Sequence, residues 1–130
     1  DVAHCFNSWT RMPSIGEQLD LPGAVTASFV VARALLRPGR YYADAVDAFQ
    51  PYDRIQDRNP ELRADLVRLV ETAAKARIPA YVLVNNRAEG SAPLTIAAVA
   101  RMLASGGGTA GAAVIAPRLV SRPESSNQSA

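Results

Sequence analysis

A short polar segment in the second half of the chain carries residue types that bind anions. The segment at 85–90 reads Asn-Asn-Arg-Ala-Glu-Gly and follows the apolar run at 80–84. Asparagine amides both donate and accept hydrogen bonds, and a guanidinium group pairs bidentately with phosphate or carboxylate. Glu89 adds a carboxylate that could act as a general base or hold a metal ion. The segment therefore predicts a ligand-binding loop with a preference for anions.

Each residue type in this loop also has a structural interpretation. Paired asparagines after a strand commonly cap backbone groups in a turn, because the Asn side chain bonds to its own neighbouring chain. Glu89 followed by Gly90 is equally typical of a simple turn. Both interpretations stay open at the level of the sequence.

The ends of three predicted strands add further candidates. In parallel α/β folds, ligands bind beyond the carboxyl ends of the strands, where the loops converge. We predict substrate contacts from Asn7, Arg11, Arg33, Asn85, Asn86 and Arg87, with Glu89 as the catalytic residue. Arg33 could instead form a structural ion pair with Glu17 or Asp53. Trp9 could stack on a sugar or a base or pack at the mouth of the fold, and His4 is more typical of a core histidine than of a catalytic one.

Apolar runs and capping signals predict the elements that position these residues. The helix after Asn59 has the strongest signal, because this N-cap residue is followed by Pro60 and then by leucines at helical spacing. Ser14 and Glu17 have the spacing of a capping box and predict a shorter helix. The predicted strands are 2–6, 26–33 and 80–84, and the predicted helices are 14–19, 42–49, 60–77 and 93–103.

The order of these elements predicts an α/β fold with a parallel sheet. Strands alternate with helices, which favours parallel pairing through right-handed crossovers. The second strand lacks clean alternation, which favours a strand covered on both faces. The apolar run at 112–116 is a candidate further strand, and the polar stretch at 121–130 is predicted to be disordered. We divide the chain into a folded part at 1–104 and a glycine-rich linker with a polar tail at 105–130.

The composition fits one globular domain and excludes several classes of protein. The chain has 130 residues, 48% of them hydrophobic, and a net charge of +2, which gives only a weak nucleic-acid signal. It has no apolar run long enough for a membrane span, and its single Cys5 suits a reducing cytoplasm. One His and one Cys exclude a zinc site of the usual kind, and neither GxxxxGK[ST] nor GxSxG occurs. Asp1 is not an initiator Met, which predicts a fragment or a processed chain.

Three stretches carry a family resemblance. They read Phe-Asn-Ser-Trp-Thr-Arg-Met-Pro at 6–13, Phe-Val-Val-Ala-Arg at 29–33, and Tyr-Val-Leu-Val-Asn-Asn at 81–86 leading into Arg-Ala-Glu-Gly-Ser-Ala-Pro at 87–93. Together they resemble the C-terminal half of the YecE-like family, known as domain of unknown function 72, over residues 2–103. One departure concerns the second strand. Many members carry Arg followed shortly by His-Gly there, whereas Arg33 is followed by no histidine at 34–39.

The resemblance implies a fold similar to a TIM barrel. This chain would supply the later β/α units, and the N-terminal half of the same barrel would complete it. Together with the polar loop, it leads us to predict binding or hydrolysis of a phosphorylated or otherwise anionic substrate at the carboxyl face of the barrel. The alternative is a non-catalytic module that binds nucleic acid or a metabolite. No cofactor and no metal site follow from the sequence.

Overall fold

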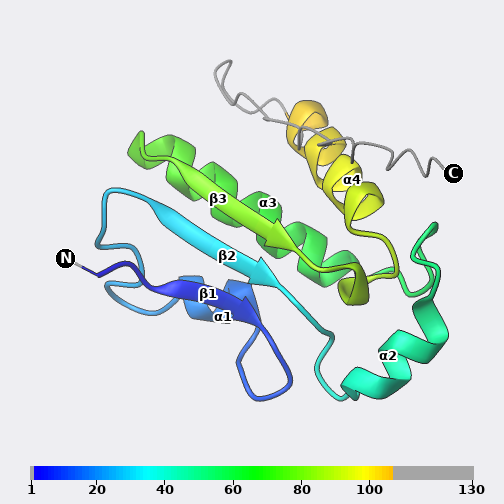
Figure 1. The fold of residues 1–130 in the computed structure, drawn as a ribbon. Helices are drawn as coiled ribbons and strands as arrows, with labels where there is room; N and C mark the ends of the chain where they lie inside the picture. Colours follow the sequence, from blue (N-terminus) through cyan, green and yellow to red (C-terminus); the bar gives the residue numbers. More distant parts are fainter. Residues whose placement is uncertain (1, 107–130) are drawn as a thin grey trace, which may run out of the picture.

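The computed structural model describes residues 2–106 as a small sheet with three helices on one side and a fourth beyond the carboxyl ends of the strands (Figure 1). The strands are β1 (Cys5–Ser8), β2 (Val30–Ala34) and β3 (Ala80–Val84). The helices are α1 (Ile15–Leu19), α2 (Tyr42–Phe49), α3 (Pro60–Ala76) and α4 (Ala92–Ser105), with a 3-10 turn η1 (Asn86–Ala88) before α4. All strand pairs are parallel, in the order β1-β2-β3. The predicted α/β class with a parallel sheet is therefore confirmed.

Two strands begin later than the sequence predicts, because their partners set the limits of pairing. Cys5 lies opposite Val31, so residues 2–4 precede the paired part of β1. Val30 lies opposite Ala80, where β3 begins, so residues 26–29 likewise precede β2. Apolar character shows where a strand can form, whereas the neighbouring strand decides where it begins.

The capping signals are confirmed at the starts of α1 and α3. Glu17 N donates to Ser14 Oγ at 3.1 Å, and Ser14 N donates to the Glu17 carboxylate at 2.7 Å. At α3, Leu62 N donates to Asn59 Oδ1 at 3.1 Å, and Pro60 occupies the first turn. These bonds satisfy N–H groups that have no partner within the helix itself.

One face of the sheet forms the core beneath α1 and α3. Its side chains come from alternate strand positions, because successive strand residues point to opposite faces. Leu66 and Leu69 of α3 are fully buried. The core cluster comprises Phe6, Ile15, Val30, Ala32, Ala34, Leu62, Leu66, Leu69, Ala73, Ala88 and Val99. α4 packs against α3 and extends this helical layer (Figure 1).

A close approach holds α1 against α3. A Cβ atom at Gly16 would lie 2.5 Å from an Asp65 carboxylate oxygen, so a larger residue there would require the Asp65 side chain to move. On the nearby surface, the Arg68 guanidinium donates hydrogen bonds to Asp20 and lowers the pKa of that carboxyl group. The Arg68–Asp20 pair is exposed, so it contributes little to the stability of the fold.

The opposite face of the sheet is uncovered in the described part of the chain (Figure 1). On β3, Tyr81 is 56% exposed and Leu83 is 54% exposed. The Phe29 ring, just before β2, meets the Tyr81 ring edge to face, with 6.2 Å between the two centroids. The prediction that β2 is covered on both faces is therefore wrong for residues 2–106, since the described helices cover only the other side.

The outer edge of β1 is closed by a side chain. Gln18 of α1 is 2% exposed. Its Oε1 accepts a hydrogen bond from Asn7 N at 3.2 Å, and its Nε2 donates to Asn7 O at 2.9 Å. The Gln18 amide thus occupies both outward backbone groups of Asn7, as a neighbouring strand would. Between residues 2 and 106, no side chain bonds to the backbone of β3 in this way, so β3 carries the open edge.

Replacing Gln18 with leucine should lower the free energy of unfolding by about 1–3 kcal/mol, because Asn7 N and O lose their partners. The same change opens the β1 edge to pairing with other molecules. We expect a lower urea midpoint and concentration-dependent association in sedimentation velocity. A Gln18→Leu chain with the parental midpoint and no association would show that this amide does not protect the edge.

Some sequence predictions lie outside the described residues. These are the strand at 112–116 and the polar tail at 121–130. The boundary placed after residue 104 falls within the last turn of α4 and stays a prediction. Within residues 2–106, the longest apolar helical stretch is too short to cross a membrane.

Candidate anion-binding site at the carboxyl edge of the sheet

Three segments meet beyond the carboxyl ends of β2 and β3. Asn85 N donates to the carbonyl of Ala34 at 2.8 Å, which holds the loop after β3 beside the end of β2. The carbonyl of Glu89 accepts hydrogen bonds from Gln56 N at 2.8 Å and from Asp57 N at 3.0 Å. The segment before α3 therefore packs on the loop after β3. This is the edge at which a parallel α/β fold binds its ligands.

Asn85 and Asn86 use their side-chain oxygens for structural bonds. Asn85 Oδ1 accepts a hydrogen bond from Arg87 N at 3.0 Å. Asn86 Oδ1 accepts one from Ala92 N at 2.8 Å, at the start of α4. The turn-capping interpretation therefore holds for both oxygens, and the amide nitrogens are the groups left to meet a ligand.

Glu89 is fully buried, and protein donors surround its carboxylate. Oε1 accepts hydrogen bonds from Asn59 N at 2.6 Å and from Arg63 Nε at 2.9 Å. Oε2 accepts from Arg63 Nη2 at 2.9 Å and from Thr95 Oγ1 at 2.7 Å. The side chain thus connects the loop to α3 and α4 and does not reach solvent. This geometry favours a structural role over the predicted role as a general base.

The sequence reasoning missed the partners of Glu89. Arg63 follows the apolar Leu62 in the first turn of α3 and is only 8% exposed. An arginine within the apolar face of a helix is a signal, because buried charges are paired. Glu89 is the one carboxylate in the loop after β3, so the pair could have been proposed from these two positions.

Arg87 packs on an aromatic ring of α2. Its guanidinium carbon lies 4.2 Å from the centroid of the Tyr42 ring, which is a cation–π contact. The contact joins the loop after β3 to α2. It also holds the positive charge of Arg87 at the carboxyl edge.

Asn7 and Arg33 lie side by side on the uncovered face. The parallel register places Asn7 of β1 opposite Arg33 of β2, with Leu83 of β3 on the other side. Arg33 is exposed. Among residues 2–106 it forms no ion pair, so the alternative of a pair with Glu17 or Asp53 is not realised. The register has therefore brought together two of the predicted contact residues.

The remaining candidates on and after β1 are separate from this pair. Arg11 is exposed in the loop before α1, and no other described residue bonds its side chain. Trp9, in the same loop, is 39% exposed. His4 is exposed rather than a core residue, because it precedes β1, and its Nε2 contacts Gln18 Oε1 at 3.2 Å.

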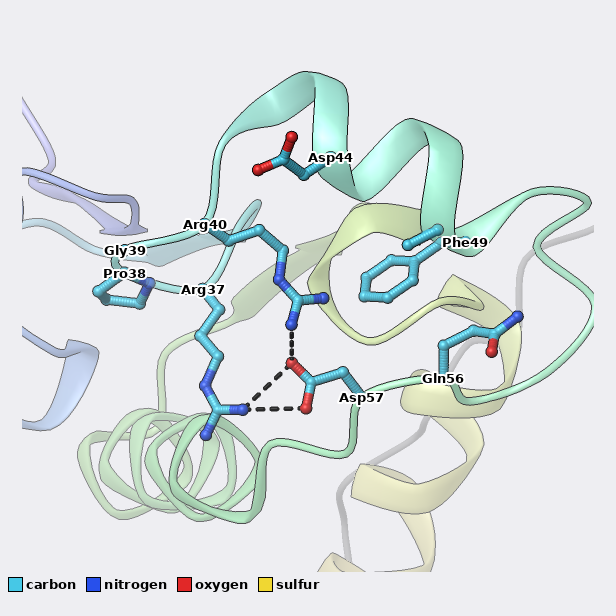
Figure 2. Close-up of a pocket in the computed structure, with 9 residues that line it drawn as sticks. Arg37, Pro38, Gly39, Arg40, Asp44, Phe49, Gln56 and Asp57 are labelled. Carbon is cyan, nitrogen blue, oxygen red and sulfur yellow. Dashed lines mark hydrogen bonds and ion pairs between the residues drawn. The ribbon is translucent and has the colours of Figure 1, made fainter.

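A cavity of about 700 Å³ opens beyond the end of β2 (Figure 2). Arg37 Nη1 donates to Asp57 Oδ1 at 2.9 Å and to Oδ2 at 3.1 Å, and Arg40 Nη2 donates to Oδ2 at 2.6 Å. The guanidinium carbon of Arg40 lies 4.7 Å from the centroid of the Phe49 ring. The lining residues are Arg37, Pro38, Gly39, Arg40, Asp44, Ala48, Phe49, Gln56 and Asp57.

Neither Arg37 nor Arg40 was among the residues predicted to contact a ligand, so the sequence did not reveal this cavity. Two arginines, Arg37 and Arg40, lie close together after the predicted strand at 26–33, and this pair could have indicated an anion site. Their shared partner Asp57 is far away in the sequence, so only the folded chain shows the cluster.

Comparisons of the chain with protein-family models, curated proteins and solved structures gave no match. The resemblance to the YecE-like family therefore remains a prediction. Over the described range, no group of three or more His, Cys, Asp and Glu side chains could hold a metal ion.

Proposed function

We propose that the chain binds an anionic small molecule at the carboxyl edge of its sheet. Arg33 carries this proposal, because its guanidinium group is exposed near the end of the central strand without a carboxylate partner among the described residues. Asn7 lies beside it; its Nδ2 donates one hydrogen bond to the carbonyl of Cys5 at 3.1 Å and has a second N–H for a ligand. A phosphate or carboxylate would accept hydrogen bonds from both side chains.

The same proposal includes a larger barrel of the YecE-like type, in which further β/α units cover the uncovered face. Parallel sheets are almost always covered on both faces, and Tyr81 and Leu83 present apolar surface there. The open edge of β3 suits a further strand. At β1, a further strand would replace the hydrogen bonds of Gln18 to Asn7 by backbone bonds. Closure of the sheet would enclose Arg33 within the mouth of the barrel.

Binding is better supported than hydrolysis by the described residues. The carboxylate of Glu89 is buried and bonded to four donor groups, so a hydrolytic base would have to come from another part of a complete barrel. Nucleic acid is a weaker candidate ligand. Four described arginines are paired with carboxylates, which reduces the positive charge available to a phosphate backbone: Arg37, Arg40, Arg63 and Arg68.

Isothermal titration of the full chain with inorganic phosphate tests the role of Arg33. Replacing Arg33 with glutamine should weaken phosphate binding by about tenfold, because one charge-assisted hydrogen bond contributes roughly 1.5–3 kcal/mol. Arg101→Gln, at an exposed position of α4, is the matched control and should bind phosphate as the parent does. Binding should also weaken with added salt.

Two results would contradict the proposed function. One is the absence of phosphate binding by the parent chain. The other is equal affinity of the Arg33→Gln and Arg101→Gln variants, since phosphate would then bind without Arg33. Thermal unfolding of each variant verifies that the fold is retained.

A further inference from the structure

We infer that the cavity beyond β2 is a second binding site, for a small phosphorylated molecule that carries hydroxyl groups. None of the residues that line it belongs to the sheet, so it is separate from Arg33. Figure 2 shows it between α2, the loop at 37–40 and the segment before α3. It is a wide and largely open depression of about 700 Å³, which exceeds what a lone phosphate ion would fill.

The two arginines of the cavity retain donors for an anion. A guanidinium group carries N–H donors on three nitrogens. Arg37 bonds to Asp57 only through Nη1, and Arg40 only through Nη2. Their other N–H groups have no protein acceptor within residues 2–106. Because two guanidinium groups share one carboxylate, the cluster of Arg37, Arg40 and Asp57 carries one net positive charge. A phosphate group would accept hydrogen bonds from the unused donors.

Asp57 retains room for one further donor. A carboxylate offers about four acceptor positions, and the arginines fill three of them. Oδ1 of Asp57 accepts one of these bonds and Oδ2 accepts two, so the unused position is on Oδ1. A hydroxyl group is a neutral donor that suits it. A phosphate ester of a hydroxylated carbon chain or ring therefore complements both the arginines and the aspartate.

The walls of the cavity are held in place by bonds that do not involve a ligand. Arg40 lies over the Phe49 ring, and the backbone N–H groups of Gln56 and Asp57 bond to the carbonyl of Glu89. Such preorganisation reduces the entropy lost on binding. The Arg40 side chain is 27% exposed, so a ligand can reach it. Asp44 also lines the cavity, so the charged lining side chains carry no net charge together, and a phosphate group would be held by the directed N–H donors of the two arginines.

Titration calorimetry with ribose 5-phosphate as the probe tests this inference on the full chain. Ribose lacks the phosphate group, and inorganic phosphate lacks the hydroxyl groups of the sugar. Each should therefore bind the cavity about tenfold more weakly than ribose 5-phosphate. Arg40→Lys keeps the charge but loses the planar fork, and it should weaken binding of ribose 5-phosphate by roughly tenfold. Arg101→Gln, at an exposed position of α4, should leave this affinity within about twofold, well below the tenfold that one charged hydrogen bond supplies.

A second measurement uses the parent chain and needs no variant. In nitrogen-15 correlation spectra, the backbone signals of Gly39 and Gln56 should move as ribose 5-phosphate is added. The inference is overturned if these signals stay in place at saturation, or if Arg40→Lys binds the probe as tightly as the parent. The inference is also overturned if Arg33→Gln no longer binds ribose 5-phosphate and Arg40→Lys still does. That result would support the proposed site at Arg33. If only Arg40→Lys loses binding of ribose 5-phosphate, the cavity is the binding site, even where Arg33 binds no anion.

Discussion

Replacing Glu89 with alanine should lower the free energy of unfolding by about 3–5 kcal/mol, which is the usual cost of leaving a buried charge without its partner. The substitution leaves the Arg63 guanidinium buried without a counter-ion. It also removes the acceptor for Asn59 N and for Thr95 Oγ1. Urea unfolding followed by circular dichroism measures the loss.

Glu61→Ala is the matched control for this substitution. Glu61 is an exposed glutamate in the first turn of α3, and its loss should cost less than about 1 kcal/mol. Arg63→Met should be nearly as costly as Glu89→Ala, because it leaves Glu89 unpaired. The double variant should lose less than the sum of the two single variants. If the free energy of unfolding of Glu89→Ala lies within about 1 kcal/mol of that of the parent, Glu89 does not hold the structure together, because breaking a buried ion pair should cost more than this.

Replacing Gly90 with alanine, in the loop after β3, should cause the second largest loss in the free energy of unfolding. Gly90 has a φ of 115°, and an added Cβ atom would lie 2.6 Å from Arg54 O and 2.8 Å from Gln56 N. The backbone strain alone costs about 1–3 kcal/mol. The collision should also displace the segment before α3 and break the bond from Gln56 N to the Glu89 carbonyl.

Gly39→Ala separates strain from collision. Gly39 has a φ of 83°, but an added Cβ atom there would meet no atom within 4 Å. We therefore expect Gly90→Ala to lose more stability than Gly39→Ala in the same urea series. We also expect the backbone signal of Gln56 to move in Gly90→Ala. Equal losses for the two variants would mean that the close approach at Gly90 is readily relieved.

Local features of this fold were predictable from the sequence. The N-cap at Asn59 and the capping box of Ser14 and Glu17 depend on residues three apart, and both form as expected. The parallel sheet followed from the alternation of strands and helices. The boundaries of β1 and β2 were less accurate, since they depend on a neighbouring strand rather than on the segment itself.

Contacts between distant segments account for what the sequence could not show. The carboxylate of Glu89 is paired by Arg63, 26 positions earlier, and Asp57 binds Arg37 across 20 positions. The Gln18 amide bonds to the backbone of Asn7 from a different element. The polar loop at 85–90 was correctly placed at the carboxyl edge, but three of its side chains proved to hold the loop: Asn85, Asn86 and Glu89. Anion binding is supported instead by Arg33, whose exposed guanidinium group lies near the end of the central strand.

Anion binding at the carboxyl ends of the strands can be measured by titrating the nitrogen-15-labelled chain with inorganic phosphate at low ionic strength. We expect saturable shifts in the backbone signals of Arg33 and Asn7, while the signals near Arg77, at the far end of α3, stay in place. Shifts spread evenly over the chain, or no saturable shift at Arg33, would contradict anion binding at this edge.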